Sequence, residues 1–299
     1  MKVLFCTDGS DTSFYAIGKA LKFLKADDQI DIITIIDWGL LPTYVTFPHE
    51  EEVESPNQKS IAEDTLNKTR NFIESKGHKI TKSEYSYGHP EVIILELIKE
   101  ENYDMVVMGS HGKKGIRKWL GSVSRKVIMK SPVPTFIARP PLKPETEYPK
   151  ETKEAIIAVD GSKCSFNAIK KATELLNLNN VSVDLLTIRP GVESLPLEIT
   201  MDNEWLENCI EKQKDIANEI LEKSNRILQE NGITARESYS LEGDAAESIL
   251  DFINHNKNDL VIMGSHGREG LSDILIGSVS KRVLDNATSP VLIIPSKQI

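Results

Sequence analysis

The chain has 299 residues, of which 39% are hydrophobic and 27% charged, and its net charge at pH 7 is -9. An acidic chain is a poor match to general nucleic-acid binders, which neutralise phosphates with clustered Lys and Arg. Its length fits two domains, and no apolar run approaches the roughly 20 residues that span a bilayer, so we expect no membrane partner.

The first half begins with an apolar run at 2–7, which Asp8-Gly9-Ser10 follows directly. No signal peptide is recognised there. Short apolar runs alternate with helical patterns, which indicates βαβ units around a parallel sheet. The stretch 37–58 is rich in proline and is expected to be a loop over the carboxyl edge of that sheet. Strands are predicted at 2–7, 30–36, 80–86, 104–108 and 133–138.

A basic cluster follows the fourth predicted strand and the motif Gly109-Ser110-His111-Gly112. A solvated helix face is the favoured interpretation, and a surface for polyphosphate or nucleic acid is the alternative. The cluster consists of Lys113, Lys114, Arg117, Lys118, Arg125 and Lys126.

Four prolines occur within residues 140–149, which can continue neither a helix nor a central strand. We therefore predict a domain at 1–140, a semi-extended linker at 141–153 and a second domain at 154–299.

The second half repeats the first. Asp160 follows Asp8 by 152 residues, Gly264 follows Gly109 by 155, and Pro290 is aligned with Pro132 at 158. Strands are predicted at 155–159, 181–188, 234–241, 259–264 and 290–294, and helices at 163–178, 203–231, 244–256 and 272–287. The stretch 189–203 is expected to be a second loop over the carboxyl edge. The chain is therefore a tandem repeat of one complete unit.

Each unit carries a glycine-rich segment that directly follows a buried strand. Gly264 and Gly267 come first, and Gly277-Ser278 opens the next helical pattern. Glycines can simply form tight turns, or they can let backbone amides approach an anion. Neither a Walker A loop nor a GxGxxG fingerprint is present.

Asp160 ends the first strand of the second unit, near the point where the strand order of a doubly wound sheet reverses. Its carboxylate could accept hydrogen bonds from adenine or ribose, or it could cap the following helix. Ser162 is the better cap of the two.

Together these motifs resemble the universal stress proteins, and the resemblance covers the chain apart from the linker. It implies an α/β fold of two tandem open five-stranded parallel sheets, order 3-2-1-4-5, with helices on both faces, packed as an internal pseudo-dimer. It also implies an ATP site of the non-Walker type. Similar proteins divide into ATP binders and members without nucleotide.

By the same resemblance, the nucleotide site draws on several segments of the second unit. The Ile188 backbone and the Asp160 side chain would address the adenine end, and Ala158, Met263 and Gly264 the ribose. The phosphates would be held by Gly267, Gly277, Ser278 and Val279, with Arg268 and Ser280 as further contacts. Mg²⁺ is a general expectation for ATP.

The two glycine segments differ in length. Eight residues separate Gly112 from Gly121, whereas nine separate Gly267 from Gly277, which is the family spacing. The last helix of the first half also looks half a turn shorter. A missing residue is expected to shift one phosphate-binding segment against the other, so we predict the main ATP site in the second half.

The three cysteines form no CxxC pair, which argues against a disulfide framework or zinc site and favours the cytoplasm. Cys6 is expected to be buried, and Cys164 and the loop histidines are interpreted as packing residues rather than catalytic groups.

The leading hypothesis is an ATP-binding stress-response or regulatory protein. A nucleotide-free interaction scaffold and an adenine-nucleotide hydrolase are the alternatives. The partners expected are an adenine nucleotide and an unidentified protein. Strands 133–138 and 291–294 are expected to pair within the chain, and association into a homodimer is left open.

Overall fold

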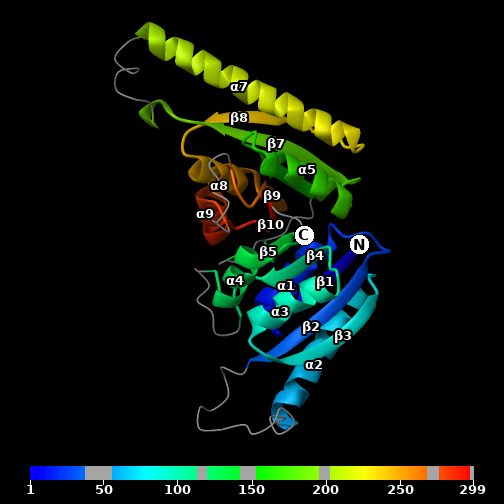
Figure 1. Cartoon of the computed structure of the whole chain (residues 1–299). Helices are drawn as coiled ribbons and strands as arrows, with labels where there is room; N and C mark the ends of the chain where they lie inside the picture. The colour runs from blue at the N-terminus through cyan, green and yellow to red at the C-terminus, as the bar shows by residue number, and fades with distance from the viewer. Residues whose placement is uncertain (38–55, 113–119, 142–152, 195–202, 268–275, 297–299) are drawn as a thin grey trace. The chain divides into compact units, whose positions relative to one another are not determined.

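The structure is a computed structural model of the whole chain that describes residues 1–37, 56–112, 120–141, 153–194, 203–267 and 276–296 (Figure 1). The chain divides into two compact units, unit 1 (Met1–Leu142) and unit 2 (Lys143–Ile299). Each contains five parallel strands and a hydrophobic core.

Unit 1 is a doubly wound α/β unit with one parallel sheet of order β3-β2-β1-β4-β5. This confirms the predicted order. Its elements are β1 (Lys2–Cys6), α1 (Asp11–Leu21), β2 (Gln29–Asp37), α2 (Pro56–Ser75), β3 (Ile80–Gly88), α3 (Pro90–Glu100), β4 (Met105–Gly109), α4 (Ser122–Lys130) and β5 (Thr135–Ala138).

Unit 2 repeats that topology, with the parallel order β8-β7-β6-β9-β10. Its elements are β6 (Lys153–Ala158), α5 (Lys163–Leu175), β7 (Val181–Arg189), the 3₁₀ turn η3 (Val192–Ser194), α7 (Asn203–Glu230), β8 (Ser238–Glu242), α8 (Ala245–Asn256), β9 (Leu260–Gly264), α9 (Ser278–Asn286) and β10 (Val291–Ile294).

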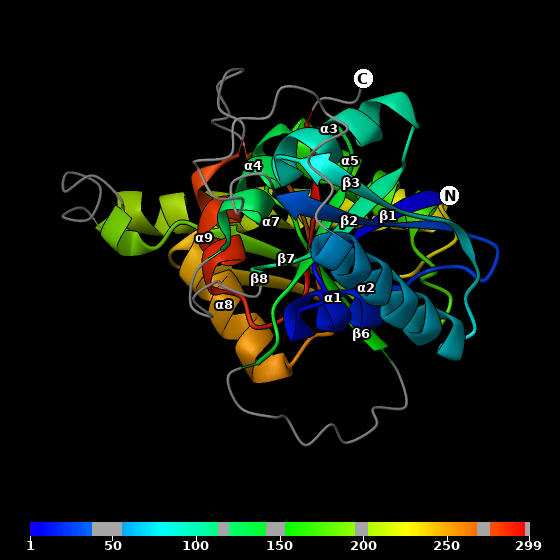
Figure 2. The same cartoon turned by 90° about the horizontal axis from the view of Figure 1, so that it is seen from below.

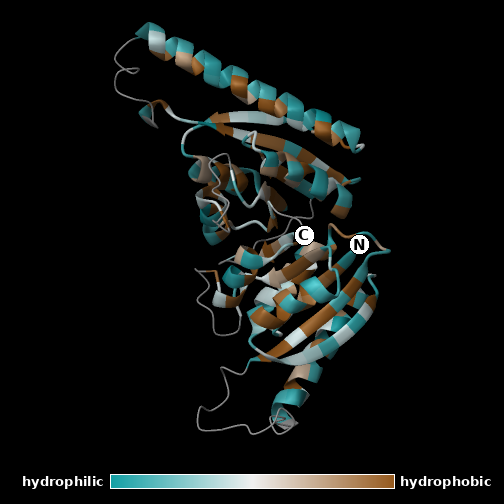
Figure 3. Cartoon of the chain, in the orientation of Figure 1, coloured by the Kyte–Doolittle hydropathy of each residue, from teal (hydrophilic) through white to brown (hydrophobic). Residues whose placement is uncertain are grey.

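The strands β4 and β9 have no polar side chain because helices cover both faces of each sheet (Figure 2). All five residues of β4 and all five of β9 are buried. In unit 2, α5 contacts α7, while α8 contacts α9. Figure 3 shows hydrophobic stretches in the inner strands, whereas β3 and β8 are largely hydrophilic or neutral. This double cover places the loops, and any ligand, at the ends of the strands.

The helices α4 and α9 are each nine residues long, so the predicted shortening of the last helix in the first half is wrong. The error arose from aligning Pro132 with Pro290. In the structure, the Pro134 carbonyl accepts from the Val106 amide at 3.0 Å, and the Pro290 carbonyl accepts from the Val261 amide at 2.9 Å. Pro134 is therefore the counterpart of Pro290, at the same offset of 156 residues that separates Gly121 from Gly277.

Several predicted boundaries shift by a few residues. The third strand of unit 2 begins at Ser238 rather than 234, and α9 begins at Ser278, while 272–275 of the predicted helix lie outside the described residues. The parts of both predicted edge loops at 38–55 and 195–202 also lie outside them. Among the helices that are described, none is long and apolar enough to cross a membrane.

Candidate functional site

The predicted site residues that the structure describes lie at the carboxyl ends of three neighbouring strands of unit 2. Ala158 at the end of β6 is in register with Met263 of β9. The Val159 amide donates to the Leu186 carbonyl of β7 at 2.8 Å, and Ile188 lies two residues further along β7. The sheet register therefore brings Ala158, Met263 and Ile188 to the same end of the sheet.

Asp160 begins the turn between β6 and α5. Gly161 has a φ of 82°, in the left-handed region that glycine adopts without strain. The Asp160 carboxylate accepts from the Ser162 amide at 3.0 Å, whereas the Ser162 hydroxyl oxygen accepts from the Ser165 amide at 3.1 Å. Ser162 is the N-cap of α5, which confirms that prediction. Asp160 orders the turn and does not cap the helix.

Gly267 lies against the Asp160 carboxylate. A Cβ atom at position 267 would lie 2.7 Å from Asp160 Oδ2, closer than real Cβ contacts. Glycine at this position thus lets the carboxylate and the loop backbone occupy adjacent space.

Gly264 has a different role, because it packs the end of β9 against the start of α5. A Cβ at 264 would lie 2.7 Å from Cys164 Sγ and 3.2 Å from the Cys164 backbone. Cys164 is buried there, with its sulfur 4.0 Å from Ser265 Oγ. Gly264 and Cys164 are therefore packing partners, as interpreted for Cys164.

The second glycine segment is fixed to the first by two hydrogen bonds. The Gly277 amide donates to the Ser265 carbonyl at 2.7 Å, and Ser280 Oγ donates to the Gly264 carbonyl at 2.9 Å. The buried Ser280 hydroxyl has one hydrogen, and the strand takes it. Ser280 thus positions α9, and its hydroxyl hydrogen is not available to a phosphate.

The N-terminus of α9 faces the same edge. Its N-cap is Gly277, which has no side chain to take up the amides of the first turn. Ser278 is exposed and Val279 half-buried at the first two helical positions. These amides and the Ser278 hydroxyl form the kind of helix start that binds anions. Arg268 lies outside the described residues.

Unit 1 contains the same framework. The Gly121 amide donates to the Ser110 carbonyl at 2.6 Å, Ser124 Oγ donates to the Gly109 carbonyl at 2.8 Å, and a Cβ on Gly112 would lie 2.7 Å from Asp8 Oδ2. The predicted shift between the glycine segments is therefore absent from the described residues. The length difference falls between Gly112 and Leu120, at residues 113–119, which the structure does not describe.

The histidines of the repeated motif are held by neighbouring hydroxyls, a role that sequence reasoning assigned only in general terms. His111 is buried, with Nδ1 at 2.9 Å from Ser110 Oγ and Nε2 at 3.2 Å from Thr12 Oγ1. His266 has the equivalent contact to Ser265 at 2.9 Å, but Cys164 occupies the position of Thr12. The offset of 152 residues between Thr12 and Cys164 could have revealed this difference.

Ser265 was also missed as a structural residue. Its amide donates to the Ile294 carbonyl at 2.8 Å, and its hydroxyl oxygen accepts from the Ser296 amide at 3.1 Å. It ties the glycine segment to the end of β10.

Ion pairs join the helices on the side of the sheet that carries α9. Arg282 of α9 contacts Asp244 at 2.8 Å and Glu247 at 3.2 Å. The Glu247 amide and the Arg282 guanidinium lower the pKa of Asp244, which is the N-cap of α8. Lys126, at the equivalent position in α4, lowers the pKa of Glu91 in the same way. Lys126 is thus an ion-pair partner, while Lys113, Lys114, Arg117 and Lys118 lie outside the described residues.

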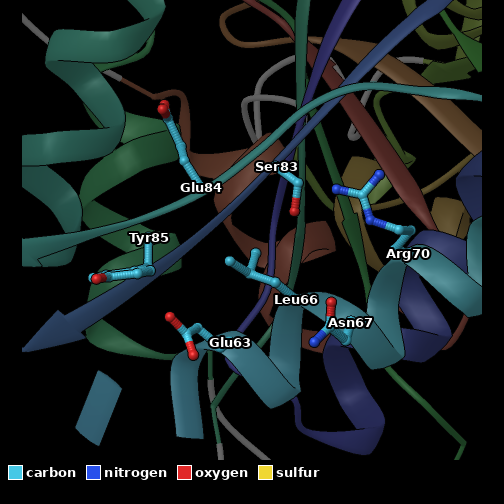
Figure 4. Close-up of a pocket in the computed structure, with 7 residues that line it drawn as sticks. All are labelled: Glu63, Leu66, Asn67, Arg70, Ser83, Glu84 and Tyr85. Carbon is cyan, nitrogen blue, oxygen red and sulfur yellow. The ribbon is translucent and has the colours of Figure 1, made fainter. Parts of the chain in front are cut away.

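A separate groove of about 480 Å³ lies in unit 1 between the middle of α2 and β3 (Figure 4). Its lining is mostly polar, and no site was predicted there. The lining residues are Glu63, Leu66, Asn67, Arg70, Ser83, Glu84 and Tyr85.

Cys6 is buried as predicted, and burial raises the pKa of its thiol. The described residues contain no cluster of three His, Cys, Asp or Glu side chains that could hold a metal ion.

Comparisons with known proteins agree with this fold. The model of the universal stress protein family matches residues 1–139 and again 151–295. A universal stress protein from Methanocaldococcus jannaschii is 34% identical over 151 residues, which cover 49% of this chain and 85% of that protein. One from Synechocystis is 24% identical and covers 97% of this chain and 98% of that protein. The crystal structure of a universal stress protein from Archaeoglobus fulgidus superposes with a TM-score of 0.63 at 21% identity, covering 98% of this chain and 96% of that one.

Proposed function

The chain belongs to the universal stress protein family, and on that premise we propose that it binds ATP at the carboxyl edge of the unit 2 sheet. The observation that carries the proposal is the juxtaposition of the Asp160 carboxylate, the backbone at Gly267 and the N-terminus of α9. A carboxylate suits the nucleoside, and a glycine backbone with a helix start suits phosphates.

The nucleoside end of the ligand is assigned to the strand ends. Asp160 accepts hydrogen bonds from the base or ribose, and the Ile188 backbone borders the base. Ala158 and Met263, which are in register across β6 and β9, lie beneath the ribose together with Gly264. The close packing of Gly264 on Cys164 supports a rigid floor at this place.

The phosphates are assigned to Gly267, Gly277, Ser278 and Val279. The cradle fits this role because a Cβ at Gly267 would fill space beside Asp160, and because Gly277 leaves the α9 amides uncapped by a side chain. Mg²⁺ commonly binds through nucleotide phosphates, and we propose that it accompanies them here. Arg268 acts at the margin of the site, and Ser280 supports the site by fixing α9 to the end of β9.

Unit 2 is proposed as the main site because its glycine segments have the family spacing of nine residues. The matched hydrogen bonds in unit 1 refine the reason. Since both frameworks are equally anchored, the difference in affinity arises from the eight residues between Gly112 and Gly121, not from a displaced α4.

We further propose a regulatory role in which bound nucleotide biases a surface for a protein partner, in a chain located in the cytoplasm. Packing of the two units as an internal pseudo-dimer through β5 and β10 stays a prediction.

Mass spectrometry of the chain purified without added nucleotide, followed by titration calorimetry with ATP, tests the proposal. We expect co-purified adenine nucleotide and one tight site, which Asp160→Ala weakens and the matched Asp8→Ala leaves intact. Absence of binding at any nucleotide concentration would favour the scaffold alternative. Two equal sites would refute the asymmetry, and release of pyrophosphate with a second substrate would favour the hydrolase.

A further inference from the structure

The helix α7 has 28 residues, whereas its counterpart α2 in unit 1 has 20. Figure 1 shows the N-terminal end of α7 extending beyond β8. The buried residues of α7 begin only at Ala217, and none of residues 203–216 is buried. The first fourteen residues of the helix thus contribute little to the core of unit 2.

This extension carries a strip with the spacing of a coiled-coil seam. Trp205, Cys209, Lys212 and Ile216 are separated by four, three and four residues, which places them along one side of the helix. Trp205 is 61% exposed and Ile216 is 40% exposed. We call these four residues the α7 strip.

The strip ends where the helix joins the body of unit 2. The same spacing continues to Lys223, whose ammonium lies 4.3 Å from the centre of the Phe166 ring in α5. At Lys223, this side of α7 already contacts α5 of the same unit. The α7 strip is therefore confined to residues 205–216.

We propose that the α7 strip binds the α7 strip of a second copy of this chain, with the two helices antiparallel. The proposal follows from self-complementarity. The spacing of four, three and four residues is the same when it is read from either end of the strip. One antiparallel register therefore sets Trp205 against Ile216 of the partner subunit and Cys209 against Lys212 of the partner subunit. Apolar residues then meet at both ends of the contact.

Charge selects this orientation over the parallel one. A parallel, in-register pair would set Lys212 against Lys212 of the partner subunit, which is repulsive. The antiparallel pair instead brings Lys212 within reach of the partner subunit's Trp205, where a cation–π contact is favourable. Residues 203–216 carry four acidic and two basic side chains, which disfavours an anionic membrane as the occupant.

The contact is short, which predicts a transient dimer. Twelve residues span about 18 Å of helix. A helix pair of that length buries less than the roughly 1,200 Å² typical of stable interfaces. Association is therefore expected only at high protein concentration.

Sedimentation velocity on the full chain tests this, over a concentration series reaching about 100 μM because small interfaces are weak. We expect concentration-dependent dimers that Trp205→Glu and Ile216→Glu each weaken at least tenfold. The matched control is Ile61→Glu on α2, a residue that is 52% exposed and outside the strip. All three residues are exposed, so thermal unfolding should be unchanged. A chain that stays monomeric, or dimers indifferent to both strip variants, would overturn the proposal.

Cross-linking tests the orientation separately. In a Cys209→Ser background, Trp205→Cys and Ile216→Cys chains are prepared separately and mixed with a short bismaleimide. The antiparallel register predicts covalent dimers between unlike chains, while each chain alone gives little. Cross-linking of each variant with itself, and not with the other, would overturn the antiparallel arrangement. Cys6 and Cys164 are buried and provide the background control in Cys209→Ser alone.

Discussion

Replacing Gly267 with alanine is the sharpest test of the proposed nucleotide site, because the new methyl group would meet the Asp160 carboxylate. The Cβ atom would lie 2.7 Å from Oδ2, and contacts below 3.0 Å force a rearrangement. Asp160 is already held by the Ser162 amide at 3.0 Å, so its carboxylate must rotate or break that bond.

The size of the effect follows from what the carboxylate does in the proposal. A hydrogen bond to a charged group contributes about 1.5 to 3 kcal/mol, which corresponds to a loss of about 10-fold to 150-fold in affinity. Gly267 is exposed, so the fold should be little affected. Titration calorimetry with ATP measures the affinity, and thermal unfolding checks the fold.

The repeat supplies a matched control, since Gly112 has the same 2.7 Å relation to Asp8 in unit 1. Gly112→Ala should leave the tight site unchanged. The double variant Gly267→Ala with Asp160→Ala should lose no more than Asp160→Ala alone, because both changes act through one carboxylate. Additive losses, or an equal loss from Gly112→Ala, would refute the reasoning.

Three further predictions concern stability. Gly264→Ala should destabilise the chain by about 1 to 3 kcal/mol, because its Cβ would press on the Cys164 sulfur and backbone; a melting temperature equal to that of the wild type would contradict this packing. Arg236→Met should lower the free energy of unfolding in chemical denaturation by about 1 to 3 kcal/mol, because it removes the partly exposed guanidinium that donates to the buried Asp184 carboxylate at 3.0 Å. Asp184→Leu in the same chain should recover much of the loss, and no recovery would contradict the argument. Arg282→Ala should lower the melting temperature at pH 7. Asp244 has a lowered pKa in the folded state, so its stabilisation is present above its unfolded pKa and is lost as pH falls through the folded value. The difference in melting temperature between the variant and the wild type should therefore narrow below about pH 4. A difference that does not depend on pH would argue against the ion pair.

The sequence was sufficient for the fold because the strand pattern is strong and occurs twice. Continuous apolar runs such as 260–263 are typical of strands that are covered on both faces, and the repeated glycine motif indicated where the chain turns after the fourth strand of each unit. Helix caps were readable for the same reason, since Ser162 directly precedes the α5 pattern.

What the sequence could not decide depended on contacts between distant residues. Pro132 and Pro134 are equally good candidates for the start of the last strand by composition, and only the bond from Val106 to the Pro134 carbonyl distinguishes them. The role of Ser280 was equally hidden, because its spacing from Gly277 says nothing about the carbonyl that takes its hydrogen. The ion pair between buried Asp184 and exposed Arg236 joins residues that are 52 positions apart and has no local signal.

The hydrogen bonds from Gly277 to Ser265 and from Ser280 to Gly264 hold the start of α9 beside the end of β9, so residues 268–276 connect two fixed points. For such a segment, a change from nine residues to eight alters the closure entropy by only about 0.1 kcal/mol. The stability of the framework is therefore nearly independent of this one-residue difference, and the residues between the glycines can vary without unfolding it. The two units of this tandem repeat thus keep the same framework hydrogen bonds, while the residues between their glycines differ in number and kind.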